Sequence, residues 1–260
     1  MRIVVLVKPV PDTTGQEHLG PDLRVDRMAD PAVLNANDEY ALEAALKLRE
    51  AAGEGTVTLL TMAPAHAPEA LRRALAMGAD GGVLVTDPAL EGADTLTTVR
   101  VLAAALARLE YDLVLAGSDT SDGGAGIVGA GVAALAGLPY LSAAARIEPT
   151  AGRVRVHRIS PTGYDLLEAP LPAFIVATQA LGEPRYPSLR GIMAARAKQL
   201  DVWSLADVGL DPARVGGAQS TTRVTATRQP AAREATRVIR EPAAVAAVQV
   251  ADFLAARRLI

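Results

Sequence analysis

Short apolar runs alternate with amphipathic stretches over the first half of the chain. The runs cover residues 2–8, 56–62, 82–86 and 111–116, and each is almost wholly apolar. Such runs are typical of strands in a parallel sheet whose two faces are both covered. The alternation therefore predicts an α/β domain.

Three segments between the runs have the periodicity of amphipathic helices, at residues 38–51, 68–77 and 95–109. Asn37 is well placed to cap the first of them, and Pro68 suits a first helical turn because its missing N–H costs nothing there. We expect these helices to cover the sheet.

After residue 122 the alternation stops. Residues 123–136 are rich in glycine and alanine and are predicted to be helical from about Ile127. Extended runs at 139–147, 153–158 and 173–178 follow without helices between them. This order indicates an antiparallel or mixed extension of the sheet.

The last part of the chain has a different composition. A helix is predicted at 192–198, and beyond residue 200 the chain is rich in proline, threonine and arginine until a final helix at 243–258. Residues 200–242 have too few apolar side chains to form a core of their own. We therefore expect an α/β domain over residues 1–199 and a C-terminal arm over residues 200–260.

The amino-acid composition excludes several classes of function for this chain. The net charge of -3 provides no broad basic field for nucleic acid. The chain has no cysteine, and its three histidines are too scattered for a zinc or other metal site, so redox chemistry would need an organic cofactor. No apolar segment is long enough to span a bilayer, and the first strand begins too early for a signal peptide. We expect a protein that is not membrane-embedded and lies in the cytoplasm.

Three segments are expected to meet at the carboxyl ends of the strands, where open parallel sheets bind ligands. They are residues 7–12, 34–43 and 117–129. The last suits a phosphate, because its glycines permit close approach of the backbone and the free N–H groups of a first helical turn attract negative charge. Each segment also has a purely structural interpretation, as a rigid turn, a helix cap or a glycine turn.

No catalytic constellation accompanies these segments. Ser118, Thr120 and Ser121 have no nearby histidine to activate them, and the loop lacks the Gly-Lys-Ser/Thr ending of a P-loop. The sequence favours a binding protein without catalytic turnover of its own. A nucleotide-binding stress protein or an ATP-hydrolysing protein is the competing hypothesis, and the missing phosphate-binding lysine argues against it.

Four motifs resemble the β subunits of electron transfer flavoproteins, and the similarity extends to about residue 210. They read Val-Lys-x-x-x-Asp at 7–12, Leu-Asn-x-x-x-Glu-x-Ala-x-Glu at 34–43, Arg-Ala-Leu-Ala-Met-Gly-Ala-Asp at 73–80 and Glu-Pro-Arg-Tyr-Pro-Ser-Leu-x-x-Ile-Met-x-Ala at 183–195. The motifs occur in the order and spacing of the family.

The resemblance implies a Rossmann-like, adenine nucleotide α-hydrolase-like fold with a mostly parallel, doubly wound sheet. It implies a heterodimer with a larger α subunit that holds most of the FAD, and AMP bound in the β subunit. Electrons would come from flavin dehydrogenases such as acyl-CoA dehydrogenases and would pass to a quinone oxidoreductase. The alternative is an electron-bifurcating or nitrogen-fixation-type β subunit with a second FAD in the AMP pocket.

The resemblance also assigns two sets of functional residues. The pocket for AMP, or for the second FAD, would be formed by Leu6, Asn35, Ala36, Asn37, Asp38, Met62, Gly117, Ser118, Asp119, Thr120, Ser121, Asp122, Gly123, Gly124, Ala125, Gly126, Ile127 and Val128. Partner recognition would use Arg185, Tyr186, Pro187, Leu189, Ile192 and Met193. An exposed Leu189 would be the apolar anchor, and positive charge around it would attract an acidic partner.

One segment and one single position depart from the pattern of the family. Gly124-Ala125-Gly126-Ile127 replaces the hydroxyl and amide side chains that relatives carry in the phosphate loop, which leaves phosphate binding to backbone N–H groups alone. Ile159 stands where many relatives have a glutamate. A role of that carboxylate in docking or domain motion therefore does not transfer to this chain.

Overall fold

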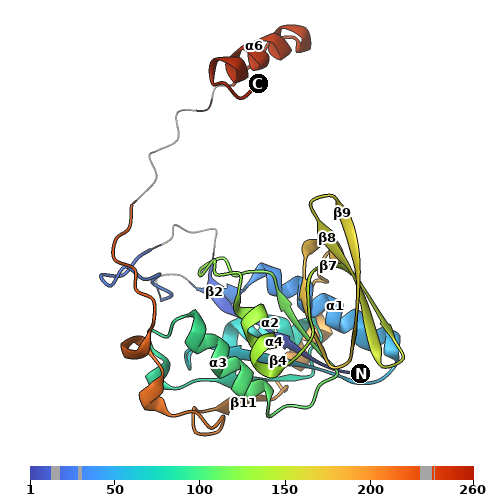
Figure 1. Cartoon of the computed structure of the whole chain (residues 1–260), viewed down its shortest axis with the longest axis vertical. Coiled ribbons are helices and arrows are strands. Elements are labelled where there is room, and N and C mark those ends of the chain that lie inside the picture. The colour runs from blue at the N-terminus through green and yellow to red at the C-terminus, as the bar shows by residue number, and fades with distance from the viewer. Residues whose placement is uncertain (13–17, 29–30, 229–235, 237) are drawn as a thin grey trace. The chain divides into compact units, whose positions relative to one another are not determined.

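The computed structural model describes residues 1–12, 18–28, 31–228, 236 and 238–260. It divides into two compact units, Met1–Thr225 and Ala226–Ile260. The first unit contains the sheet and the helices packed on it, and the second contains the terminal helix (Figure 1).

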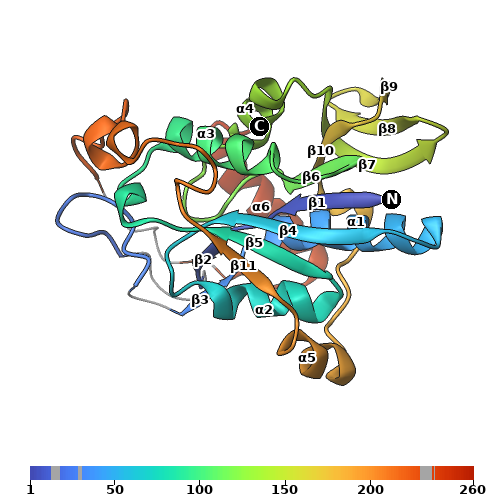
Figure 2. The same cartoon turned by 90° about the horizontal axis from the view of Figure 1, so that it is seen from below.

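Nine strands of the first unit form one sheet in the order β11-β5-β4-β1-β6-β10-β7-β8-β9, which Figure 2 shows side by side. Seven of them run parallel: β1 (Arg2–Leu6), β4 (Thr56–Met62), β5 (Gly81–Val85), β6 (Leu113–Gly117), β7 (Tyr140–Thr150), β10 (Ala173–Ala177) and β11 (Leu200–Trp203). The first four are the apolar runs of the sequence, so the predicted α/β fold with a mostly parallel sheet is confirmed.

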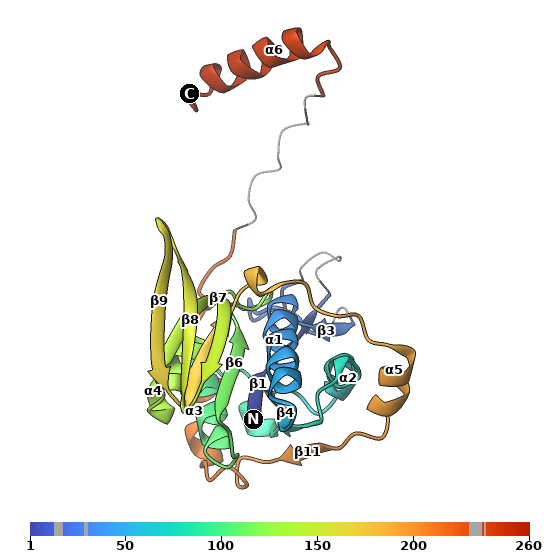
Figure 3. The same cartoon turned by 90° about the vertical axis from the view of Figure 1, so that its right-hand side faces the viewer.

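Helices cover both faces of the parallel strands (Figure 3). One face packs on α1 (Ala36–Ala52) and α2 (Pro68–Met77), and the other packs on α3 (Thr95–Leu106) and α4 (Val128–Ala136). Alternate residues of β1 supply the two cores: Ile3 and Val5 lie in the first, and Val4 and Leu6 lie in the second. This is why the strand has no polar positions between its apolar ones.

The sheet continues beyond β10 as a mixed extension: β7 is parallel to β10, whereas β8 (Arg153–Ser160) and β9 (Gly163–Pro170) continue from it in antiparallel pairs. The predicted extension is therefore present. Strand β9 was missed in the sequence because only one face of it is covered: Leu167 packs on the core, whereas Tyr164 and Leu166 are exposed.

The C-terminal part differs from the expected arm. Leu200–Trp203 forms β11, which pairs in parallel with β5 at the edge of the sheet. Leu205, Val208 and Val215 are buried in the second core, so a few apolar residues attach this segment although it is polar overall. The compact unit therefore extends to Thr225, beyond the expected boundary at residue 199.

Helix boundaries also shift. The helix predicted at 192–198 is α5 (Leu189–Ala195), because the Ser188 hydroxyl accepts a hydrogen bond from the Gly191 N–H at 3.0 Å and caps it one turn earlier. The terminal helix is α6 (Ala243–Ala256), and none of its side chains is buried. Within the described residues, every helix is too short or too polar to span a bilayer.

Smaller elements complete the described structure. They are the hairpin of β2 (Pro9–Pro11) and β3 (Ala32–Leu34) and the 3-10 turns η1 (Pro88–Leu90), η2 (Gln179–Leu181), η3 (Pro212–Arg214) and η4 (Gly217–Gln219).

Candidate functional site

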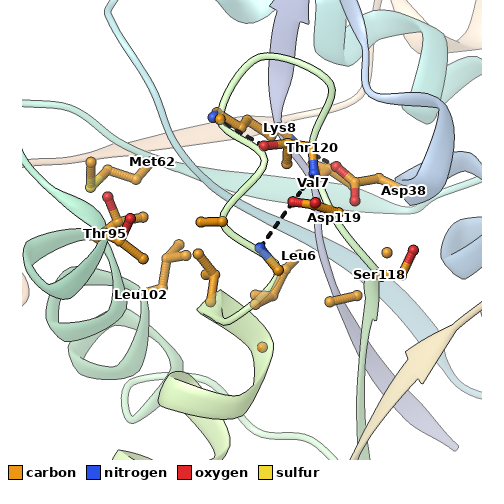
Figure 4. Close-up of a pocket in the computed structure, with 18 of the residues that line it drawn as sticks. Leu6, Val7, Lys8, Asp38, Met62, Thr95, Leu102, Ser118, Asp119 and Thr120 are labelled. Atoms are coloured by element: carbon orange, nitrogen blue, oxygen red, sulfur yellow. Dashed lines mark hydrogen bonds between the residues drawn. The ribbon is translucent and has the colours of Figure 1, made fainter. Parts of the chain in front are cut away.

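A cavity of about 230 Å³ opens beyond the carboxyl ends of β1, β4 and β6 (Figure 4). From β1 the chain runs to β4 and β5 on one side of the sheet and then returns to β6 on the other. The cavity therefore lies at the point where strand order reverses, the place at which open α/β sheets bind ligands.

The structure brings most of the predicted pocket residues to this cavity. Those that line it are Leu6, Asp38, Met62, Gly117, Ser118, Asp119, Thr120, Gly123, Ala125, Gly126 and Val128. The predicted residues outside its lining are Asn35, Ala36, Asn37, Ser121, Asp122, Gly124 and Ile127. Two of these, Asn35 and Asn37, form hydrogen bonds to Asp119, which lines the cavity.

Two asparagines at the start of α1 hold the loop after β6. The side-chain amides of Asn35 and Asn37 both donate to the carbonyl oxygen of Asp119, at 2.9 and 3.0 Å. The helix begins at Ala36 with Asn35 as the N-cap, and no side chain caps it. The predicted capping role of Asn37 is therefore wrong, because its amide is used across the site instead.

Asp38 is the buried carboxylate of the cavity. It accepts a hydrogen bond from the backbone N–H of Lys8 at 2.8 Å and another from the N–H of Gly117. Burial raises the pKa of Asp38 to about 7, although the hydrogen bonds from Asn35, Lys8 and Gly117 oppose the rise. This carboxyl joins the ends of β1 and β6 to α1.

Gly117 lies where the loop passes closest to α1. A β-carbon at this position would lie 2.5 Å from Oδ1 of Asp38 and 2.6 Å from the backbone carbon of Asn37. Only glycine fits this approach without displacing the helix.

The loop after β6 folds back on itself before α4. Oδ1 of Asp119 accepts from the N–H groups of Thr120 at 2.7 Å and of Gly126 at 3.0 Å. The backbone is left-handed at Gly124 and Gly126, with φ values of 54° and 61°. The N-cap of α4 makes no side-chain hydrogen bond, so the first N–H groups of this helix lack a capping side chain beside the cavity.

Two cations line the cavity: Lys8, which belongs to the predicted segment 7–12, and Arg27, which was missed in the sequence. Nζ of Lys8 lies 2.7 Å from one carboxylate oxygen of Asp122, and Nε of Arg27 lies 2.6 Å from the other. The Asp122 side chain is only 2% exposed; burial would raise its pKa, but Lys8 and Arg27 outweigh that effect and lower it. Lys8 and Arg27 therefore bring positive charge to a cavity in which only backbone N–H groups were expected to meet a phosphate.

The start of α3 forms the opposite wall of the cavity, which sequence reasoning also missed. Asp94, Thr95 and Thr98 line it. Oδ1 of Asp94 accepts from the Thr97 N–H at 2.8 Å, and Oδ2 accepts from both the N–H and the hydroxyl of Thr221 at 2.7 Å. In the sequence, this wall is indicated locally by Asp94-Thr95, where a residue suited to an N-cap precedes the helix predicted at 95–109.

The segment proposed for partner recognition lies on α1 and α2. Tyr186 is 88% exposed and Leu189 is 79% exposed, and Ile192 and Met193 on α5 are exposed as well. Arg185 differs from the expectation of a free positive charge, because its guanidinium is bonded to two glutamates of α1. We call residues 185–193 the docking segment.

Positive charge nevertheless remains around the docking segment. Arg190 and Arg196 are exposed, and neither forms an ion pair with another side chain in the described part of the chain. The described residues also contain no cluster of three or more side chains suited to a metal ion.

Comparison with known proteins gives consistent matches over the chain. Residues 22–208 match the model of the electron transfer flavoprotein domain. The electron transfer flavoprotein subunit beta of Mycobacterium tuberculosis is 39% identical over 265 residues, which cover 99% of both chains. The corresponding subunit of Clostridium acetobutylicum is 35% identical and covers 98% of both. Subunit CarD of the caffeyl-CoA reductase-Etf complex of Acetobacterium woodii is 36% identical, over 90% of this chain and 89% of its own.

Proposed function

The chain belongs to the electron transfer flavoprotein β-subunit family, and on that premise we propose that it binds AMP in the cavity described above. A β subunit of this family works in flavin-based electron transfer together with an α subunit. We propose that the α subunit holds most of the FAD. This chain would position the flavin and its surroundings, since the electron transfer itself is the chemistry of the flavin.

The observation that carries the AMP proposal is the cavity at the switch point of the sheet. It combines the uncapped start of α4, the close backbone approach at Gly117 and the cations Lys8 and Arg27. These groups fit a phosphate, which helix N–H groups and charged side chains both favour. The apolar side chains of Leu6, Met62 and Leu102 suit an adenine ring.

Nucleotide analysis of the heterodimer tests this proposal. We would co-express the chain with its α subunit, record the visible spectrum, and extract the bound nucleotides. One FAD and one AMP per heterodimer are expected. A colourless, nucleotide-free complex with every candidate α subunit would contradict the proposal.

A second FAD in place of AMP is the alternative function. The wall at the start of α3 favours it, because Thr95 and Thr98 offer further polar groups to a larger nucleotide. Two flavins per heterodimer without released AMP would establish this alternative and refute the AMP proposal.

We also propose the route of the electrons and the contacts of the chain. The donors would be flavin dehydrogenases such as acyl-CoA dehydrogenases, and the acceptor would be a quinone oxidoreductase. The protein would act in the cytoplasm without catalytic turnover of its own. Helix α6 is rich in alanine and valine and buries no side chain within its own unit, which supports a role in packing on the α subunit.

Replacing Arg27 by methionine should weaken AMP binding about 10-fold, the scale of one charge-assisted hydrogen bond. Lys8 still pairs with Asp122 in this variant, so the buried carboxylate keeps a partner. Adenosine affinity should stay unchanged, because only the phosphate contact is lost. Titration of the nucleotide-depleted heterodimer with AMP and with adenosine measures both.

Arg153→Met is the matched control for this experiment. Arg153 is similarly exposed but pairs with Glu168 on the antiparallel extension. If Arg27→Met and Arg153→Met bind AMP equally well, Arg27 has no role at the phosphate.

Leu189→Ala should weaken coupling to the electron-donating dehydrogenase by about 1 to 3 kcal/mol, the usual effect of truncating an interface anchor. Leu189 is 79% exposed, so the free protein should keep its stability and its flavin content. Steady-state reduction of the heterodimer by the dehydrogenase gives the KM. Leu166→Ala, at a similarly exposed leucine of β9, should leave the KM unchanged.

A further inference from the structure

Arg185 at the start of the docking segment is bonded to two carboxylates of α1. Its Nε and Nη2 donate to Glu43 at 2.7 and 3.2 Å, and its Nη1 and Nη2 donate to Glu50 at 2.6 and 3.0 Å. The backbone N–H of Arg185 also donates to Glu43 at 3.1 Å. Glu43 and Glu50 are seven residues apart, about two helical turns, so both carboxylates lie on one side of α1.

Glu43 provides a buried attachment for this arginine. Its side chain is 5% exposed, whereas that of Arg185 is 34% exposed. Burial by itself would raise the pKa of Glu43, but the hydrogen bonds from Arg185 outweigh burial and lower it. The pKa of Glu50 is lowered mainly by the hydrogen bond from Arg185. Both carboxylates are therefore charged at neutral pH, and all three nitrogens of the guanidinium bond carboxylates within the chain.

The other end of the docking segment is attached to α2. A β-carbon on Gly191 would lie 2.3 Å from the carbonyl oxygen of Ala76, so α5 contacts the end of α2 at a distance that only glycine permits. Helix α2 is joined to α1 by the ion pair of Arg73 with Glu39. The docking segment is therefore attached at both ends to the packed helices α1 and α2.

Between these attachments the docking segment exposes large side chains. Tyr186 and Leu189 are 88% and 79% exposed, and they follow Arg185 by one and four residues. A segment without an attachment at Arg185 would sample many conformations, and a partner would have to order it on binding. Holding a loop in its bound conformation removes that entropic cost.

We propose that Arg185 is a positioning residue, which fixes the docking segment on Glu43 and Glu50 so that Leu189 is presented to the electron-donating protein in one conformation. The inference rests on the proposed docking function. It replaces the expectation from the sequence that Arg185 itself contacts the partner.

A double-mutant cycle on the heterodimer tests this inference. Arg185→Met should raise the KM of the dehydrogenase for the heterodimer about 10-fold, with kcat, FAD content and nucleotide content unchanged. In a background of Leu189→Ala, the same change should raise the KM less than 2-fold further, because the two residues act through one contact. Arg185→Lys should recover only part of the loss, since an ammonium cannot bond both carboxylates in the same planar geometry.

A second variant separates positioning from stability. Arg185→Met leaves Glu43 as a buried charge whose remaining ion-pair partner among the described residues is the exposed Lys47, at 3.4 Å, and this would destabilise the fold. Arg185→Met/Glu43→Gln removes that charge and should restore the melting temperature, while the raised KM persists. Hydrogen exchange of residues 186–190 should increase in both variants.

Three outcomes would overturn the inference. A normal KM in a folded Arg185→Met/Glu43→Gln heterodimer would show that positioning is unimportant. Fully additive effects of Arg185→Met and Leu189→Ala would show that Arg185 acts by its own contact with the partner. A normal KM in Leu189→Ala, with increased exchange in Arg185→Met, would refute the docking function itself, whereas the other two outcomes leave that function intact.

Discussion

Gly117→Ala should abolish nucleotide retention and lower the free energy of unfolding by about 3 kcal/mol, the upper range for overpacking a closely packed site. The added β-carbon would lie 2.5 Å from Oδ1 of Asp38, 2.6 Å from the backbone carbon of Asn37 and 2.8 Å from its oxygen. Backbone atoms of a packed helix cannot move aside as a flexible side chain would. The start of α1 must therefore shift away from the loop that borders the cavity.

Chemical denaturation and nucleotide extraction measure the two effects of Gly117→Ala. Gly217→Ala is a suitable control, because a β-carbon there would meet its nearest atoms at 3.5 Å, an ordinary contact distance. The control should keep both stability and bound nucleotide. Retention of AMP by folded Gly117→Ala would show that this close approach is not part of the binding site.

The contribution of Asp38 to the free energy of unfolding should fall as the pH rises from about 4 to about 7. Burial raises the pKa of its carboxyl from 3.8 to about 7 in the folded protein. Between these values the folded state binds a proton that the unfolded state has lost, so the free energy of unfolding decreases with pH. At about 1.4 kcal/mol per pKa unit, the full decrease amounts to about 4 kcal/mol.

The variant Asp38→Asn isolates this contribution. Asparagine does not titrate, so the stability of the variant should lack this decrease with pH. The variant should be less stable overall, because the asparagine side chain cannot accept hydrogen bonds from both backbone N–H groups. Other titrating groups are common to both proteins and cancel in the difference. We would measure unfolding by urea at several pH values from 4 to 8. Parallel profiles for the two proteins would refute a protonated Asp38 below pH 7.

The elements that the sequence predicted well are those with strong local patterns. Helix α2 begins and ends at the predicted residues, Pro68 and Met77, because a proline starts it, an apolar stripe runs along it and Gly78 follows it. Strand β4 also agrees with its predicted range, since all seven of its residues are β-branched or apolar, which favours a strand. Local chemistry was sufficient in both cases.

The candidate site was predicted in outline for a related reason. Strand ends, helix starts and glycine turns are readable in sequence, and parallel strands bring their carboxyl ends to one edge. Leu6, Asp38, Met62 and the glycine-rich loop meet at the cavity accordingly. The contacts of Asn37 and Arg185 were not predicted, because each binds a group from a distant part of the chain.

The sequence alone determined the alternation of strands and helices, the place of the cavity in the sheet and the likeness to a family, because these depend on periodicity and on motifs of neighbouring residues. Only the tertiary structure decided which charges pair. Arg27 and Asp122 are 95 positions apart, and Arg185 and Glu43 are 142 apart. A guanidinium can bond a carboxylate from any part of the chain, so no local pattern indicates its partner. Packing of the helices on the sheet brings the two groups together.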